Sequence, residues 1–240
     1  MAAAVATHKG PVRKRNEDNH LLDLDLGLVA VLDGMGGHRD GDVASKTASD
    51  VFQAQLTRSS LRSEGVEETA LAVETALRST HTFIRELNRG RTLRNSMGTT
   101  IVGLIFVPIR RNVILFHVGD SRAYLWQRRK LRQLTRDHST FENWRDNGAP
   151  CPRPQRNFLL QAVGVGESIA PTVTPLSVEA GDLMLLCSDG LTDVLDGRSI
   201  EVVLADVATD ALQAGCDALL EAALAAGATD NITVALLALV

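Results

Sequence analysis

Four aspartates stand at the ends of short apolar runs. Asp33 follows "LVAVL", Asp120 follows "VILFHVG", Asp189 follows "LMLLCS" and Asp230 precedes "NITVALLALV". One such aspartate is ordinary turn chemistry, because Asp favours turns and helix caps. Four indicate a cluster, since antiparallel or mixed strands can bring these ends to one edge of a sheet. Carboxylates that lie so close together must be neutralised, either by protonation, because crowding raises their pKa values, or by bound cations.

The ligand types favour cations of one kind. All-oxygen clusters without His or Cys suit hard divalent ions such as Mg²⁺ or Mn²⁺, whereas imidazole or thiolate sets suit zinc. The segment after Asp33 is Gly34, Met35, Gly36 and Gly37. Glycines let the backbone turn sharply and approach an ion, so the Gly34 carbonyl is itself a candidate ligand.

A basic segment upstream adds a complementary group. "VRKRNED" (12–18) supplies two more acids, Glu17 and Asp18, and places Arg13 five residues before Asp18. Arginine offers a planar fork of donors that suits a phosphate. Such a stretch alone is more often a solvated surface, but beside an acid cluster it indicates phosphate binding.

The elements that position these residues are short strands and longer helices. Apolar, β-branched runs predict buried strands at 26–32, 100–107, 112–118, 183–187 and 231–240. Apolar residues at helical spacing predict helices from Val66 to Leu87 and from Leu212 to Ala226, with a further helix starting near Asp42. The strands come in groups without regular βαβ alternation, which favours an α+β fold.

Three other segments carry local signals. "HVGDSRAYLWQRRKLRQL" (117–134) predicts consecutive antiparallel strands with a solvated basic turn at 128–130. "NWRDNGAPCPRPQRN" (143–157) predicts an irregular surface loop or flap. "DLDLG" (23–27) mimics the start of a calcium loop, but its interleaved leucines predict a strand.

Composition narrows the class of protein. The 240 residues, 45% of them hydrophobic, suit one globular domain. A net charge of −4 and a pI of about 5.9 argue against general affinity for nucleic acid or an anionic membrane. The longest apolar runs are too short to span a bilayer, and the first residues do not form a secretory signal. Cys151, Cys187 and Cys216 form no CxxC pair, so we expect a reducing, cytoplasmic location.

At this point the sequence resembles the metal-dependent protein phosphatases, the PPM or type 2C serine/threonine phosphatases, in their bacterial form. Seven segments match in the family's order: "GPVRKRNED" (10–18), "VLDGMGGH" (31–38), "MGTT" (97–100), "HVGDSRAY" (117–124), "LTRDHS" (134–139), "LLCSDGLTD" (185–193) and "ATDNITV" (228–234). The resemblance implies a four-layer αββα sandwich over residues 1–240, with two central antiparallel sheets flanked by helices and one catalytic domain.

The resemblance also implies a site with two Mn²⁺ or Mg²⁺ ions and a third, weaker one. Asp33 would bridge both metals, Asp189 and Asp230 would bind the first, and the Gly34 carbonyl would bind the second. Glu17 and Asp18 would hold that second ion directly or through waters. Asp120 would join Asp189 at the third metal. Arg13 would bind the substrate phosphate, so that Arg13, Asp33 and Asp189 carry the catalysis.

Two departures from the family pattern concern the proton donor and the flap. Eukaryotic members often carry His where this chain has Met35, so the donor to the leaving alcohol is unassigned, and His38 and His138 are candidates that are more typical of surface positions. The flap around 140–157 looks shorter than usual, with Arg153-Pro154 where His-Pro is common.

The expected reaction is attack on phosphoserine or phosphothreonine in proteins by a water that two ions, about 3.5–4 Å apart, activate. The expected partners are phosphoproteins, including a serine/threonine kinase or its targets, and the chain is expected to act as a monomer.

Two other phosphate-handling chemistries fail on spacing. A cysteine phosphatase needs Cys-x5-Arg, but Asp193 and Asn157 lie six positions after Cys187 and Cys151; a P-loop needs glycines where Asp40 and Ser45 stand. An inactive phosphatase-like binding domain and a small-molecule phosphoesterase stay open as alternatives.

Overall fold

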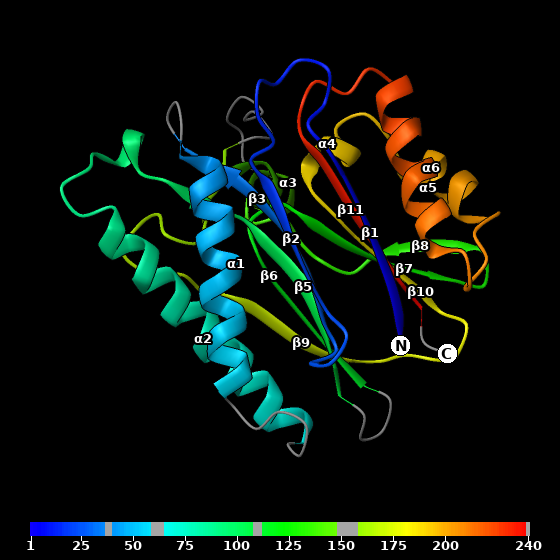
Figure 1. The fold of residues 1–240 in the computed structure, drawn as a ribbon, viewed down its shortest axis with the longest axis horizontal. Helices are drawn as coiled ribbons and strands as arrows, with labels where there is room; N and C mark the ends of the chain where they lie inside the picture. Colours follow the sequence, from blue (N-terminus) through cyan, green and yellow to red (C-terminus); the bar gives the residue numbers. More distant parts are fainter. Residues whose placement is uncertain (37–39, 59–64, 108–111, 148–157, 239–240) are drawn as a thin grey trace.

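The computed structural model describes residues 1–36, 40–58, 65–107, 112–147 and 158–238. In these ranges, two antiparallel sheets lie face to face (Figure 1). The first has the spatial order β1 (Ala2–His8), β11 (Ile232–Ala238), β10 (Leu183–Cys187), β7 (Arg122–Gln127) and β8 (Lys130–Gln133). The second has the order β2 (Asp18–Asp23), β3 (Leu28–Met35), β5 (Ile101–Val107), β6 (Asn112–Val118) and β9 (Thr172–Ser177), with β4 (Gly98–Thr99) beside β3.

Helices cover the outer face of each sheet, as Figure 1 shows. The second sheet packs against α1 (Gly41–Arg58) and α2 (Val66–Leu87). The first packs against α4 (Asp189–Thr192), α5 (Gly197–Leu204) and α6 (Leu212–Ala225). A short helix, α3 (Thr140–Asn147), and a 3-10 turn, η2 (Leu93–Asn95), lie in the connections. The predicted α+β sandwich with two antiparallel sheets and flanking helices is confirmed.

Strand β3 shows why these runs are apolar at every position. Leu28, Ala30 and Leu32 point toward the helices α1 and α2, whereas Val29 and Val31 point toward the other sheet. Successive side chains of a strand face opposite sides. A strand in the middle of a four-layer sandwich is therefore buried on both faces, and Asp33 at its end is held by a rigid element.

The predicted helices and the basic turn are confirmed. The helix expected from Val66 ends at Leu87, the one from Leu212 ends at Ala225, and the one near Asp42 begins at Gly41. Arg128 and Arg129 adopt φ values of 52° and 59° in the turn between β7 and β8. Both are exposed, as expected for a two-residue hairpin tip.

Two local predictions were wrong. Residues 24–27 form the turn between β2 and β3 and are not a strand, because the Leu26 amide donates to Asp23 Oδ1 at 2.9 Å and Gly27 has φ 69°. Residues 143–147 belong to α3 and are not irregular. The rest of the predicted flap, 148–157 with Cys151 and Arg153-Pro154, lies outside the described residues.

Among the described helices, none has both the length and the apolar composition of a bilayer span.

Candidate active site

A cavity of about 610 Å³ lies where the ends of β3, β10 and β11 meet. Seven of the eight residues expected at a metal and phosphate site line it: Arg13, Glu17, Asp33, Gly34, Asp120, Asp189 and Asp230. The eighth, Asp18, lies directly behind, because the register of β2 and β3 sets it opposite Asp33. The structure thus brings together acids that lie up to about two hundred residues apart in sequence.

Asp33 is fixed through its backbone. Its amide donates to Thr100 Oγ1 at 3.1 Å, and its carbonyl accepts from Thr99 Oγ1 at 2.9 Å and from the Thr100 amide at 2.8 Å. These bonds leave the carboxylate free to face the cavity. The two threonines of "MGTT" therefore serve to hold Asp33.

Asp18 is held by two hydroxyl groups, one from β11 and one from the residue that follows β10. Its Oδ2 accepts from Ser188 Oγ at 2.8 Å and from Thr233 Oγ1 at 2.7 Å. Ser188 in turn accepts from the Thr233 amide at 2.9 Å through Oγ. This network joins the two sheets beneath the cavity and places Asp189, the next residue, at the start of α4.

Charge accumulates in this cluster. Burial, with nearby Asp18 and Asp189, raises the pKa of Asp33 well above its usual value. Burial, with nearby Asp189, raises the pKa of Asp120 to about 7. The pKa values of Asp18 and Asp189 are also raised, chiefly by burial. The folded chain therefore gathers carboxylates that resist ionisation unless positive charge is supplied.

The donor set fits hard divalent cations. Among the described residues, Asp18 Oδ1 and Asp189 Oδ1 are buried carboxylate oxygens without a hydrogen-bond partner. Buried polar atoms of this kind are rare and call for a counter-charge or a ligand. Within the same described ranges, no three acidic, histidine or cysteine groups already surround one point as a ready-made metal site. Asp33 instead hydrogen-bonds Asp189, and Arg13 Nη2 lies 2.5 Å from Asp230 Oδ2.

Gly34 is required by close approach of the backbone. A Cβ on this residue would lie 2.1 Å from the Gly41 carbonyl oxygen and 2.5 Å from that of Glu17. The Glu17 carbonyl accepts from the Gly34 amide at 3.2 Å and from Ser45 Oγ at 2.6 Å. The first turn of α1, the loop before β2 and the end of β3 therefore pack together here with no room for a side chain.

Asn231 is a positioning residue that the sequence patterns did not reveal. Its Oδ1 accepts from the Glu17 amide at 2.8 Å, and its Nδ2 donates to the carbonyls of Lys9 at 2.8 Å and Arg15 at 2.9 Å. One buried side chain thus pins the loop that carries Arg13 and Glu17. Its place beside Asp230 was visible, but an Asn gives no signal of the loop it will bind.

We expect Asn231→Ala to lower the free energy of unfolding by about 2–3 kcal/mol, because three hydrogen bonds to backbone groups are lost. It should also lower kcat/KM, since Arg13 and Glu17 lose their support. Urea unfolding and steady-state kinetics measure both. Asn19→Ala is the matched control, because the Asn19 side chain accepts a hydrogen bond from the amide of its neighbour, His20, and so holds no distant loop. Equal effects of the two substitutions would contradict the positioning role.

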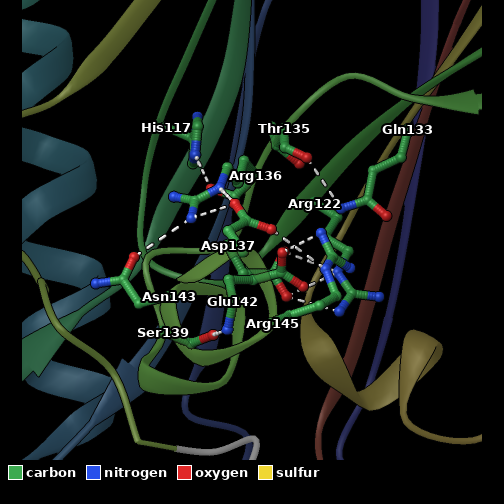
Figure 2. A network of polar contacts seen from close by, with 11 residues as sticks. His117, Arg122, Gln133, Thr135, Arg136, Asp137, Ser139, Glu142, Asn143 and Arg145 are labelled. Carbon is green, nitrogen blue, oxygen red and sulfur yellow. Dashed lines mark hydrogen bonds and ion pairs between the residues drawn. The ribbon is translucent and has the colours of Figure 1, made fainter. Parts of the chain in front are cut away.

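The turn that carries Asp120 is braced by the segment after β8 (Figure 2). Arg122 binds Asp137 through Nε at 2.9 Å and Nη2 at 2.6 Å, and Thr135 Oγ1 accepts from the Ala123 amide at 3.1 Å. The His138 amide donates to the Gly119 carbonyl at 2.8 Å. Asp120 is therefore positioned by "LTRDHS", whose residues do not themselves line the cavity.

Three residues are candidates for the proton donor to the leaving alcohol or stand in its usual place: His38, His138 and Met35. His38 lies outside the described residues. His138 does not line the cavity; its Nδ1 accepts from the Gly119 amide, its ring stacks on His117 at 4.5 Å, and burial with nearby His117 lowers its pKa to about 4. Its other ring nitrogen, Nε2, contacts Thr172 Oγ1 at 3.2 Å, so both nitrogens have partners and the geometry does not favour His138 as the donor. Met35 does line the cavity but carries no proton to give.

Cysteine chemistry is absent from the described part of this cavity. Cys187 is fully buried in β10, and burial raises the pKa of its thiol to about 12. It cannot form a thiolate nucleophile at neutral pH.

Comparisons with known proteins agree with this geometry. The family model described as Protein phosphatase 2C matches residues 13–225. The serine/threonine phosphatase stp of Listeria monocytogenes is 36% identical over 251 residues, covering 98% of this chain and 95% of the relative. The serine/threonine protein phosphatase PstP of Mycobacterium tuberculosis is 33% identical over 236 residues, covering 96% of this chain and 43% of the relative.

Solved structures share the fold over almost the whole chain. The M. tuberculosis PstP/Ppp phosphatase superposes with a TM-score of 0.85 at 30% identity, covering 98% of this chain and 97% of that one. The PstP catalytic domain in complex with two manganese ions gives a TM-score of 0.80 at 29% identity, covering 98% and 96%. The chain therefore belongs to the protein phosphatase 2C family of serine/threonine protein phosphatases.

Proposed function

We propose that the acid-lined cavity is the catalytic centre and that it hydrolyses phosphoserine and phosphothreonine in proteins with the help of two divalent ions, Mn²⁺ or Mg²⁺. The observation that supports this most is the convergence of Asp33, Asp189 and Asp230 from three strand ends on one cavity that Arg13 also lines. We further propose that residues 1–240 act as one catalytic domain and as a monomer.

The ion ligands follow from the positions around the cavity. We assign Asp33 to both ions, Asp189 and Asp230 to the first, and the Gly34 carbonyl to the second. Glu17 and Asp18 would support the second ion, and Asp120 with Asp189 would hold a weaker third. When bound, the ions supply a water whose pKa is brought toward neutrality and offset the charge of the phosphate. The complex of PstP with two manganese ions supports this metal dependence.

Arg13 is the group that would bind the phosphate. Its guanidinium is half-exposed and paired with Asp230 at 2.5 Å, so it can exchange one anionic partner for another without leaving the cavity. An arginine fork matches two phosphate oxygens. Hydrogen bonds from Thr99 and Thr100 hold Asp33, and through it the proposed ions, in a fixed position. Such positioning accounts for much of the rate enhancement in enzymes.

The choice of substrate class rests on the relatives. Stp, PstP and PhpP of Streptococcus pneumoniae are named protein phosphatases. None of the acids expected as metal ligands is missing here, which disfavours an inactive binding domain. We propose phosphoproteins, including a serine/threonine kinase or its targets, as the substrates, and a reducing, cytoplasmic location, which the free thiols of Cys187 and Cys216 support.

Hydrolysis of a phosphothreonine peptide tests the proposed function. We expect turnover with Mn²⁺ or Mg²⁺ and its loss in EDTA, with recovery when excess metal is returned. Phosphate release from p-nitrophenyl phosphate should follow the same pattern. Turnover of similar size without metal would contradict a mechanism built on the acid cluster.

Arg13→Ala should mainly raise KM, by about tenfold, because one charge-assisted contact to the phosphate is lost while the acid cluster stays in place. Initial rates over a range of phosphopeptide concentrations measure it. Lys14→Ala is the matched control, since Lys14 is an exposed cation beside Arg13 that does not line the cavity. A fall in kcat with unchanged KM would assign Arg13 to another role.

A further inference from the structure

Two unlike sets of residues line the cavity. One is polar and consists of the acids and Arg13 described above. The other is apolar and includes Met35, Leu93, Leu160, Ala162 and Val165, which we call the apolar wall. A volume of about 610 Å³ falls in the range of sites that enclose drug-sized ligands, roughly 300–1,000 Å³. This is more room than a phosphoryl group needs.

Two leucines of the apolar wall are strongly exposed. Leu93 is 73% exposed on the η2 turn, and Leu160 is 49% exposed in the chain that follows the undescribed segment. Apolar side chains exposed at the rim of a binding cavity mark surfaces that contact a ligand more often than isolated surface leucines do. A phosphate and the ions that bind it need a polar site. Binding of the phosphate therefore does not explain why these two leucines line the cavity.

The apolar wall is anchored to the strands that carry the site. The Leu160 amide donates to the His138 carbonyl at 2.8 Å. Val163 and Thr99 exchange two backbone hydrogen bonds of 3.1 and 2.9 Å. Since Thr99 also holds Asp33, one residue links Asp33 to the chain that carries Ala162 and Val165 of the apolar wall.

Helix α2 and Asn88, the residue that follows it, hold the chain that continues from the apolar wall. Asn88 Nδ2 donates to the Gly164 carbonyl at 2.9 Å, and His81 Nδ1 accepts from the Gly164 amide at 3.1 Å. Arg85 and Arg78 donate to the carbonyls of Glu167 at 2.8 Å and Ile169 at 2.7 Å. A backbone segment held at this many points needs little ordering when a substrate binds beside it, which lowers the cost of binding.

We propose that this apolar wall selects protein substrates that carry a large apolar side chain within two residues of the phosphorylated residue. The inference rests on the proposed function. With the phosphate held by Arg13 and the acid cluster, an extended peptide advances about 3.3–3.6 Å per residue, so the side chains next to the phosphorylated residue lie within reach of the apolar residues that line the same cavity. A Leu or Phe there is buried against Leu93 and Leu160, whereas a Glu loses hydration against these apolar side chains without gaining a partner.

Matched phosphothreonine peptides test the proposal on the full chain with Mn²⁺. Each peptide carries Leu, Ala or Glu at one of the four positions nearest the phosphothreonine, in an otherwise Gly and Ser background. We expect kcat/KM at the best position to be about tenfold higher for Leu than for Ala, and lower again for Glu. In Leu160→Ser the ratio of Leu to Ala should fall toward 1.

Leu71→Ser is the control variant, because Leu71 is 66% exposed on α2 and does not line the cavity. It should keep the wild-type ratio. A wild-type enzyme that hydrolyses all peptides equally would overturn the apolar-wall proposal and leave the phosphatase function intact. Loss of the ratio in both variants would also overturn it. Absence of turnover on every peptide, with metal present, would refute the proposed function itself.

Discussion

Replacing Asp189 with asparagine is expected to lower kcat for a phosphothreonine peptide by about 10²–10³-fold, the usual cost of removing one preorganised electrostatic group from an active site. Asp189 lines the cavity, and its Oδ1 is buried without a partner among the described residues. Asparagine keeps the shape but removes the negative charge that a divalent ion needs. Steady-state kinetics at saturating Mn²⁺ measures the effect.

The same substitution should not weaken the metal-free protein, because one of several crowded carboxylates is removed. Thermal unfolding in EDTA should give a Tm at or above that of the wild type, while the rise in Tm on adding Mn²⁺ should shrink. Asp196→Asn is the control: Asp196 is exposed and caps α5, and asparagine caps as well as aspartate does. If Asp189→Asn destabilised the metal-free protein and kept full activity, the acid cluster would be structural.

Removing metal should make stability depend on pH in an unusual direction. Asp33 and Asp120 have raised pKa values in the folded protein, that of Asp120 about 7, and ordinary values near 4 when unfolded. Between these values the folded state binds more protons than the unfolded state. The free energy of unfolding contributed by these groups therefore falls as pH rises from about 4 to about 7.

Divalent ions should reverse this loss at neutral pH. At a concentration of 100 Kd, one site contributes about 2.7 kcal/mol, which corresponds to a rise in Tm of roughly 5–10 °C for a domain of this size. Thermal unfolding at pH 5, 6, 7 and 8, with EDTA or Mn²⁺, measures both trends. A Mn²⁺ effect as large at pH 5 as at pH 8 would show that the ion binds away from these carboxylates.

The sequence predicted the acid cluster and the long helices well, because both depend on patterns that residue types carry by themselves. An acid after a run such as "LVAVL" marks a strand end, and the apolar spacing from Val66 to Leu87 marks one face of a helix. The positions of Asp33, Asp120, Asp189 and Asp230 around one cavity then follow from the antiparallel order of the strands.

Other features depend on tertiary contacts and left no signal. Strand β1 is rich in alanine, which disfavours a strand, yet it pairs along its whole length with β11. Strand β9 contains Pro175 and is mostly exposed, as an edge strand tolerates. Asn231 and the side chains of α2 that support the apolar wall act on backbone groups far away in sequence, so only the folded structure reveals them.

The cavity is closed by contacts between the two ends of the described chain, and this governs when activity can arise during synthesis. Arg13 meets Asp230 across 217 positions, and the Glu17 amide meets Asn231 across 214. Contacts of such sequence separation form late and slowly. A nascent chain that stops before Asp230 lacks both of these partners, so nearly all of the described chain must leave the ribosome before the cavity can be completed.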